Sequence, residues 1–376
     1  MQQIYTAKYI FDGSNLLPET AVVVQKGLIK EIITLNNLKD KRLVKNYGDC
    51  IITPGFIDLQ LNGCGGVLFN DNISHTTLEV MYQTCLGYGT TSFLPTLITC
   101  EFKDVLKALE TIKTWFTLHN NKRGVIGLHL EGPFISTIKK GIHPEQFIIP
   151  PTKELLEQIV VYKKYFPIKM TIAPEVFTIK QIQFLINNNI IVSLGHSNAS
   201  YSETQNAIKL GARSSTHMFN AMSGLSARNP GMIAAILNSD IYTGLIVDLL
   251  HVDKANIQLL NKNKPEQVYL VTDAVTSMGT DMKGFQFGGK SIHVKDGMCL
   301  NENGVLAGAN LTMPKAIANC INICGLDIVK VLNMASQIPA QVMGYGNSLG
   351  KIQSGYKADL IAFNVKDQTC QYLANS

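Results

Sequence analysis

The chain has 376 residues, of which 46% are apolar and 16% carry a charge. Globular proteins contain about 25% charged residues, so this balance indicates a large buried core and excludes a disordered chain, a charged tail and a coiled coil. The net charge of +5 is spread thinly, without a basic block. This excludes a nucleic-acid binder and is compatible with a small anionic substrate.

Eight cysteines are scattered through the chain, mostly within apolar stretches. Their density is far below that of a scaffold held together by disulfides. The first residues lack the basic and apolar regions of a signal peptide, and no uncharged apolar run reaches the roughly 18 residues of a membrane span. We therefore expect a cytoplasmic protein with reduced cysteines and no membrane partner.

Short alternating stretches at both ends of the chain predict strands. Residues 3–50 alternate apolar and polar side chains between turn residues, and residues 356–373 do so again. Neither segment is long enough to form a core by itself. We expect residues 1–52 and 346–376 to form one small β-sandwich domain.

Between these ends, strand-like and helix-like stretches alternate. Eight continuous apolar runs have the character of buried parallel strands, and they span residues 55–62, 91–99, 125–132, 169–175, 190–197, 214–220, 242–250 and 268–274. Eight strand–helix units predict an α/β fold of the (β/α)8 TIM-barrel type over residues 53–345. An open doubly wound sheet is disfavoured, since no G-x-G-x-x-G follows the first strand. Residues 281–310 predict an insertion of short strands, followed by helices around 312–324 and 327–343.

The carboxyl ends of barrel strands carry the active site, and polar residues recur at these ends here. They are Gln60, Asn62, His129, Glu131, His196, His217, Asp248, His251 and Asp273. No two of them form a local motif, so only the barrel can bring them together. His75, His119 and His293 lie elsewhere and are interpreted as structural.

Glu131 closes a buried apolar strand, where an acid is costly unless it is paired or metal-bound. Together with His196 and His217 it forms a carboxylate plus two imidazoles, a set that suits a zinc-type ion with one position left for water. His129 shares the face of Glu131 one layer deeper and is expected to support the site. Asp273 is either the general base or a further ligand, and its position alone does not decide between these roles.

The motifs PGFIDLQLNGCGG, LPTLIT, GLHLEGPF, KKGIHP, GHSNA, THMFNAM, NPGM, LHVD, LVTDA and LAGANLTM occur in this order. From about residue 50 onward the chain thus resembles the N-acetylglucosamine-6-phosphate deacetylases of the amidohydrolase superfamily. The resemblance implies hydrolysis of N-acetyl-D-glucosamine 6-phosphate to D-glucosamine 6-phosphate and acetate, a step of amino-sugar catabolism.

The resemblance also implies roles for individual residues. Glu131, His196 and His217 would hold the metal, Asp273 would act as general base and then acid, and His143 would polarise the acetamide carbonyl. The substrate would be bound by Ile142, Asn220, Ala221, Arg228, His251, Leu306, Ala307 and Gly308. Arg228 would reach the phosphate, in the neighbouring site of a homodimer.

Three positions depart from the superfamily pattern. Gln60 and Asn62 stand where a histidine pair usually helps to bind a second metal, and neutral amides are poorer ligands for such an ion. We therefore expect one divalent ion per subunit, Zn²⁺ in the first place with Fe²⁺, Co²⁺ or Mn²⁺ as alternatives, and Gln60 and Asn62 in the shell around it. Leu249 stands where glycine is common, which puts the backbone contacts of residues 248–250 in question.

Two other functions compete with this interpretation. Amidohydrolases such as dihydroorotases commonly carry a carbamylated lysine at a strand end, and none of the predicted strand ends has one. A catalytically inactive scaffold would be expected to lose metal ligands, whereas all four residues of the predicted centre are present.

Overall fold

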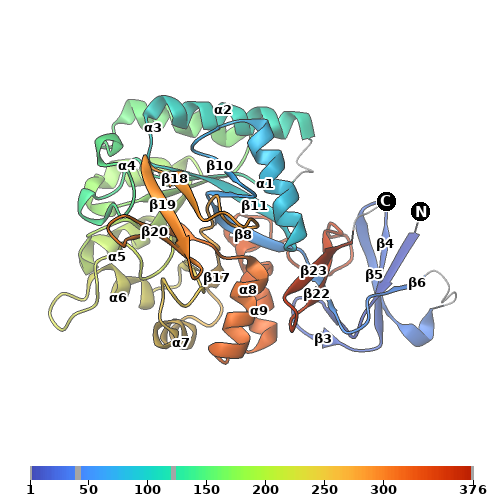
Figure 1. Ribbon diagram of the computed structural model, residues 1–376. Helices are drawn as coiled ribbons and strands as arrows, with labels where there is room; N and C mark the ends of the chain where they lie inside the picture. Colours follow the sequence, from blue (N-terminus) through green and yellow to red (C-terminus); the bar gives the residue numbers. More distant parts are fainter. Residues whose placement is uncertain (1, 39–43, 120–123, 374–376) are drawn as a thin grey trace.

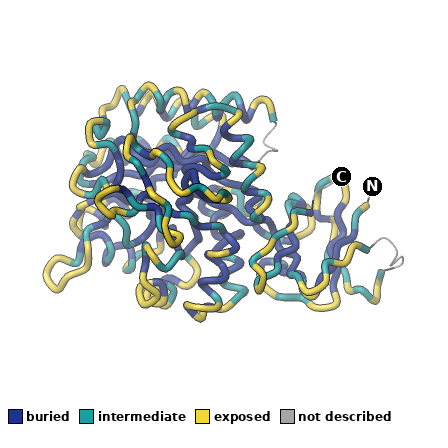
Figure 2. Tube along the Cα trace, viewed as in Figure 1, coloured by how far each residue is buried: buried dark blue, intermediate teal, exposed yellow. Residues whose placement is uncertain are grey.

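The computed structural model describes residues 2–38, 44–119 and 124–373. A large barrel of strands and helices stands beside a smaller part, built mainly of strands, that carries both chain ends (Figure 1). Each part has its own buried interior (Figure 2). No helix among the described residues is long and apolar enough to span a membrane, and all eight cysteines are free.

Eight parallel strands form the barrel in chain order, which confirms the predicted fold class and all eight predicted strands. They are β8 (Phe56–Leu61), β11 (Thr90–Ile98), β12 (Leu128–Glu131), β13 (Ile168–Ile172), β14 (Ile191–Leu194), β15 (Ser214–Ser215), β16 (Tyr242–Leu245) and β17 (Val268–Leu270). The last strand meets the first just beyond β17, where Leu61 bridges Ala274 and the Asp273 amide donates to the Gln60 carbonyl at 3.0 Å.

Helices cover the outside of this ring (Figure 1). They are α1 (His75–Gly87), α2 (Phe102–His119), α3 (Lys153–Val160), α4 (Ile179–Asn187), α5 (Tyr201–Leu210), α6 (Gly231–Leu237), α7 (Lys254–Asn263), α8 (Met313–Ala318), α9 (Ile328–Ala335) and α10 (Gln337–Val342). Most begin at a side-chain cap. Ser200, for example, accepts from the Glu203 amide while the Glu203 side chain returns to the Ser200 amide.

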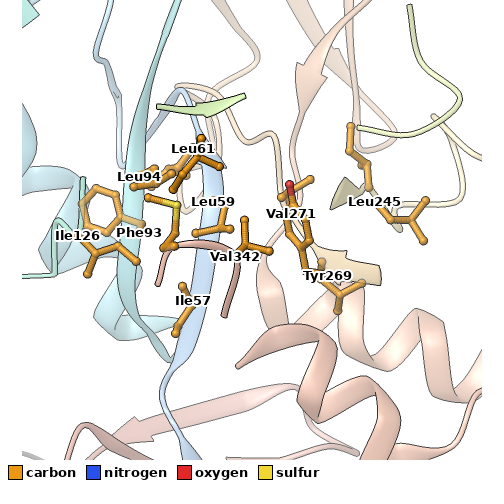
Figure 3. Packing of buried hydrophobic residues seen from close by; sticks show 14 of the residues in the cluster. Ile57, Leu59, Leu61, Phe93, Leu94, Ile126, Leu245, Tyr269, Val271 and Val342 are labelled. Carbon is orange, nitrogen blue, oxygen red and sulfur yellow. The ribbon is translucent and has the colours of Figure 1, made fainter. Parts of the chain in front are cut away.

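Strand alternation separates the two faces of the barrel wall. Ile57, Leu59 and Leu61 of β8 belong to the main apolar cluster, and Figure 3 shows them near Val342 of α10. The intervening residues of β8, among them Gln60, face the barrel interior and its polar groups. The apolar side chains of β8 are therefore buried under the helices, and its polar side chains lie in the barrel interior.

The prediction of one helix over residues 327–343, the second after the insertion, is wrong. The chain forms α9 and α10 with a break at Ser336, whose φ is −136° and ψ is −72°. Pro339 explains the break, because proline has no amide proton to donate and its ring clashes with the carbonyl four residues earlier, that of Ala335. The helix predicted over 312–324 consists of α8 and a π-helical turn, Asn319–Ile323.

The insertion forms a four-stranded antiparallel sheet of β18 (Gly284–Phe287), β19 (Lys290–Lys295), β20 (Met298–Asn301) and β21 (Leu306–Ala309). The Ala309 amide donates to the Asp273 carbonyl at 2.9 Å, and the Val275 amide donates to the Ala309 carbonyl at 3.2 Å. The sheet also packs through Phe287 against Ile98 and Ile142, and a hairpin of β9 (Gly63–Cys64) and β10 (Val67–Leu68) adds Leu68 to this cluster. The insertion is thus fixed against the end of the last barrel strand.

The smaller part consists of two sheets around one apolar cluster. One sheet has the order β5 (Leu28–Thr34), β4 (Thr20–Gln25), β1 (Gln2–Thr6), β6 (Val44–Asn46); the other has the order β23 (Thr369–Tyr372), β22 (Leu360–Asn364), β7 (Ile51–Pro54), β2 (Tyr9–Phe11), β3 (Leu16–Leu17). Val22, Ile52 and Leu360 share the cluster, so the C-terminal tail does return to the N-terminal strands. The exact division into two domains stays a prediction, and residues 1, 39–43 and 374–376 of the predicted small domain lie outside the described ranges.

Candidate active site

A cavity of about 180 Å³ opens at the carboxyl ends of the barrel strands. It is lined by Asn62, Ile98, Glu131, Gly141, Ile142, His143, His196, His217, Asn220, Ala221, His251, Asp273, Phe287, Val305, Leu306 and Gly308. These residues come from seven barrel strand ends, from the loop after β12 and from the insertion. The barrel therefore brings together residues that are up to 246 positions apart, from Asn62 to Gly308.

Three residues of the predicted site do not line this cavity. Gln60 lies directly behind it and reaches it through hydrogen bonds. The Ala307 side chain packs into the apolar cluster of the insertion. Arg228 is exposed and lines a separate surface hollow with Ser200 and Asn229, so within its own chain it is not part of the cavity.

Glu131, His196 and His217 converge on one point. His217 Nε2 lies 2.9 Å from Glu131 Oε1, His196 Nε2 lies 3.4 Å from the same oxygen, and the two Nε2 atoms are 3.0 Å apart. Ligands at about 2.0–2.1 Å from a tetrahedral ion are separated by about 3.3 Å, which is close to these spacings. The three side chains are buried. A buried carboxylate with two facing imidazole nitrogens therefore fits a divalent cation.

The ionisation of Glu131 also favours the binding of a cation. Burial opposes ionisation of Glu131, but hydrogen bonds from His196 and His217 outweigh it and hold the pKa of its carboxyl well below the usual range. His196 Nδ1 donates to the Lys139 carbonyl at 2.9 Å, which fixes the ring in an orientation that directs Nε2 at the cluster. His217 Nδ1 is buried and has no hydrogen-bond partner among the described residues.

His143 lies beside this group, and its ligand atom comes within 4.8 Å of those of Glu131 and His196. The set with His217 in place of His143 has the shorter spacings between its ligand atoms. The Thr99 amide donates to His143 Nδ1 at 3.4 Å, and the Thr99 hydroxyl lies 2.8 Å from the same nitrogen. Burial and the neighbouring His196 hold the pKa of His143 well below its usual range. The ring is therefore neutral, with its proton on Nε2.

Asp273 is held by two side-chain amides, one in β8 and one directly after it. Asn62 Nδ2 donates to Asp273 Oδ1 at 2.7 Å, and Gln60 Nε2 donates to the same oxygen at 3.1 Å and to Glu131 Oε1 at 2.9 Å. In this arrangement the two amides position the carboxylates by donating to them. Burial and then the Glu131 charge raise the pKa of Asp273 to about 6, close to the working range of a general base.

The backbone at the strand ends adopts unusual angles. His196, His217 and Asp273 have φ values of 47°, 26° and 50°, in a region that side chains rarely occupy and that clusters at functional sites. Leu249 has a φ of 67°, which explains physically why glycine suits this position. The turn still forms, since Asp248 Oδ1 accepts from the Leu250 and His251 amides at 2.9 Å each.

His251 is oriented by the same carboxylate. Its Nδ1 lies 2.6 Å from Asp248 Oδ2, and the ring lines the cavity. Because Nδ1 donates to the carboxylate, the ring is held in one orientation. This also fixes the direction of the other ring nitrogen, Nε2. Burial raises the pKa of Asp248, but the hydrogen bond from His251 outweighs it and the net pKa is lowered.

Beneath Glu131, His129 spans two hydroxyl groups, with Nδ1 at 3.2 Å from Thr96 Oγ1 and Nε2 at 2.8 Å from Thr171 Oγ1. Burial and then the Lys169 charge hold the pKa of His129 well below its usual range, so the ring is neutral. It lies one layer below the cavity, where the alternation of β12 places it. His75 and His119 instead contact α2, through the Thr111 and Trp115 carbonyls.

Sequence reasoning missed three apolar residues of the cavity wall. Ile98, Phe287 and Val305 line the cavity, and two of them come from the insertion and its connections. An isolated phenylalanine in a short strand gives no signal of this role. It could have been found only by expecting the insertion to fold over the strand ends.

Gly308 allows β21 to approach the strand end that carries Asp273. Its φ is 67°, and a Cβ there would lie 2.4 Å from Val275 Cγ1 and 3.0 Å from the Asp273 carbonyl oxygen. Gly304 has a similar φ of 72°, but a Cβ there would meet nothing within 4 Å. Substituting alanine at each glycine therefore distinguishes two destabilising effects: the strained backbone conformation, which both positions share, and the steric contact, which only Gly308 has.

We expect Gly308→Ala to lower the free energy of unfolding by about 1–3 kcal/mol more than Gly304→Ala does. Both variants are destabilised because alanine is strained at a positive φ. Only Gly308→Ala also forces an added carbon against Val275 and the Asp273 backbone. Chemical denaturation of the two variants measures the difference. Equal destabilisation would show that β21 can move away from Asp273 at little cost.

Comparison with known proteins gives a consistent result. The model of the amidohydrolase family matches residues 51–375. The chain is 36% identical to the N-acetylglucosamine-6-phosphate deacetylase of Haemophilus influenzae, over 97% of this chain and 96% of that protein. It is 34% identical to the N-acetylgalactosamine-6-phosphate deacetylase of a Shewanella species, over 94% and 90%. The crystal structure of N-acetylglucosamine-6-phosphate deacetylase from Pasteurella multocida is 38% identical, covers both chains fully and superimposes with a TM-score of 0.95.

Proposed function

This chain belongs to the amidohydrolase family, and we propose that it hydrolyses N-acetyl-D-glucosamine 6-phosphate to D-glucosamine 6-phosphate and acetate. One observation carries the proposal. Asp273 lies in the same cavity as the Glu131, His196 and His217 group and the neutral His143. This combination can bind a carbonyl oxygen, activate a water molecule and protonate an amine.

Glu131, His196 and His217 would hold one divalent ion, for which we propose Zn²⁺. When bound, such an ion polarises a carbonyl oxygen and lowers the pKa of water. The amide donors Gln60 and Asn62 stand where further imidazoles would be needed for a second ion, and both already donate to Asp273. This supports a single-ion site.

The residues of the chain then perform the proton transfers. Asp273, fixed by Asn62 and Gln60, accepts a proton from water as the water oxygen attacks the acetamide carbon. His143 donates its Nε2 proton in a hydrogen bond to the carbonyl oxygen, where negative charge develops. As the C–N bond breaks, Asp273 returns the proton to the nitrogen, so that the amine leaves neutral. The acetyl group leaves as acetic acid, which loses its remaining proton to solvent and becomes acetate.

Around this centre, Ile142, Asn220, Ala221, His251, Leu306 and Gly308 are proposed to bind the sugar phosphate, with Ala307 supporting them from the cluster behind. His251, oriented by Asp248, would donate to the phosphate. No lysine is among the described residues that line the cavity, which disfavours an amidohydrolase that relies on a carbamylated lysine there. The free cysteines are compatible with a reducing, cytoplasmic location.

The proposal is tested by measuring acetate release from N-acetylglucosamine 6-phosphate by the purified, zinc-loaded protein. N-acetylgalactosamine 6-phosphate serves as the second substrate, because a relative of similar identity carries that name. We expect turnover of the gluco substrate with the higher kcat/KM. Preference for the galacto substrate would change the assigned sugar, and no acetate from either would overturn the proposal.

Phosphate recognition gives a separate prediction. Arg228 is exposed and outside its own chain's cavity, so we propose that it reaches the phosphate in the partner site of a homodimer. A guanidinium matches a phosphate with paired hydrogen bonds. Arg228→Ala should therefore raise KM for the phosphorylated sugar by about tenfold or more, and leave the slow hydrolysis of N-acetylglucosamine unchanged.

Arg213→Ala is the matched control, since the Arg213 guanidinium donates to the Gln341 carbonyl at the opposite end of the barrel. Equal losses on both sugars would make Arg228 structural. Mixing Arg228→Ala with Asp273→Asn subunits tests the dimer, because a heterodimer contains one site with both residues intact. No recovery despite subunit exchange would remove Arg228 from the partner's site.

A further inference from the structure

Lys169 is an unpaired charge inside the barrel. The residue has no exposed surface, and its Nζ has no hydrogen-bond partner among the described residues. The other fully buried lysine in the described part of the chain, Lys264, differs because its Nζ donates to the Ser239 carbonyl. Of these two buried ammonium groups, only the one inside the barrel therefore lacks a local partner.

The position of Lys169 follows from strand register. It lies on β13 opposite His129 of β12, two residues before Thr171, whose hydroxyl contacts His129. Alternation puts Lys169 on the same inward face as Thr171, one layer below Glu131. The Tyr269 ring, labelled in Figure 3, lies 5.9 Å from the ammonium and supports it from another strand.

The charges that act on this ammonium are the carboxylates of the barrel. Burial lowers the pKa of Lys169 to about 8, against the raising effect of Glu131, Asp58 and Asp273. The amine is consequently protonated at pH 7. His129, which lies beside Lys169 in the same layer of the barrel, is neutral and adds no charge of its own.

Stability does not account for such a residue. Burying an ammonium without a direct partner costs free energy, and a neutral side chain of similar size is usually less costly. The charge has its strongest effect where the dielectric is low and the carboxylates lie within reach, which is at the floor of the cavity. The Lys169 ammonium therefore changes the electrostatic potential at the cavity floor.

We propose that Lys169 is an electrostatic positioning residue that supplies a fixed positive potential beneath the metal and carbonyl sites. This potential has two consequences of opposite sign. It weakens the attraction of the Glu131, His196 and His217 group for a divalent cation. It also stabilises the negative charge that develops on the acetamide oxygen. The second consequence rests on the proposed function, whereas the first requires only that the group binds a metal ion.

The test compares Lys169→Met and Lys169→Gln with wild type and with the control Lys264→Met. Each metal-free protein is titrated with Co²⁺ at pH 7 against a chelator, and the visible absorption of the bound ion is recorded. We expect both Lys169 variants to bind Co²⁺ about tenfold or more tightly than wild type. We also expect kcat to fall by about tenfold with KM nearly unchanged. Lys264→Met should alter neither quantity.

Each result supports or contradicts the proposal. Unchanged Co²⁺ affinity in folded Lys169 variants overturns it, and so does weaker binding. If Lys169→Met fails to fold, Lys169→Gln carries the comparison; if neither neutral variant folds, the charge serves the fold and the proposal is wrong. A wild-type protein that binds no Co²⁺, or that binds it but releases no acetate, would instead overturn the proposed function.

Discussion

Asp273→Asn should retain the metal and the substrate affinity while kcat falls by a factor on the order of 10² to 10⁴. The substitution keeps the shape of the side chain, and Oδ1 can still accept the hydrogen bonds that Asn62 and Gln60 donate. An amide, however, cannot take a proton from water or deliver one to the departing amine. Steady-state kinetics with metal analysis of the same preparation measures all three quantities.

Asp281→Asn is the control for this experiment, because Asp281 is exposed and does not line the cavity. It should leave kcat and KM unchanged. A metal-free Asp273→Asn protein would make Asp273 a ligand and remove its assignment as general base. A variant with full kcat would place the base elsewhere in the cavity.

Much of the architecture could be predicted because buried parallel strands have a simple pattern. Eight continuous apolar runs, separated by amphipathic stretches, specify a barrel, and the barrel specifies that its strand ends share one edge. Glu131, His196, His217 and Asp273 each follow such a run. Their convergence therefore follows from topology, even though no two of them form a local motif.

The details of the site depend on contacts that no local pattern encodes. The backbone at His196, His217 and Asp273 has a positive φ, a conformation that their residue types do not indicate. The hydrogen bonds that Gln60 donates to two carboxylates require that β8, the first barrel strand, lies close to the ends of both the third and the last strand. Phe287 reaches the cavity only because its sheet folds over the strand ends.

Lys169 illustrates the same limit. Within its short strand it looks like an irregularity in an apolar run, and alternation alone would not distinguish an inward lysine from one at a strand edge. Register with His129 and the approach of Tyr269 settle its location. That the Lys169 ammonium is buried without a hydrogen-bond partner is evident only from the three-dimensional structure.

His217→Ala should lose the metal and the activity together. The imidazole is the side chain closest to Glu131 in the cluster, with 2.9 Å between Nε2 and Oε1, and its removal leaves two protein ligands where structural and catalytic zinc sites use three or four. We expect the metal affinity to fall by more than the roughly 10–100-fold that removal of a residue orienting a ligand costs. Elemental analysis and acetate release measure the two losses, and wild type should contain about one ion per chain.

His251→Ala provides the matched control for that loss. His251 lines the same cavity, but its Nδ1 is bound to Asp248 and it lies outside the metal group. This variant should keep its ion and lose affinity for the phosphorylated sugar, so that KM rises while metal content does not change. If His217→Ala retained its ion, the wider set of Glu131, His143 and His196 would become the metal site. Two stoichiometric ions in fully active wild type would mean that Gln60 and Asn62 do not prevent a second ion from binding, and the single-ion mechanism would be wrong.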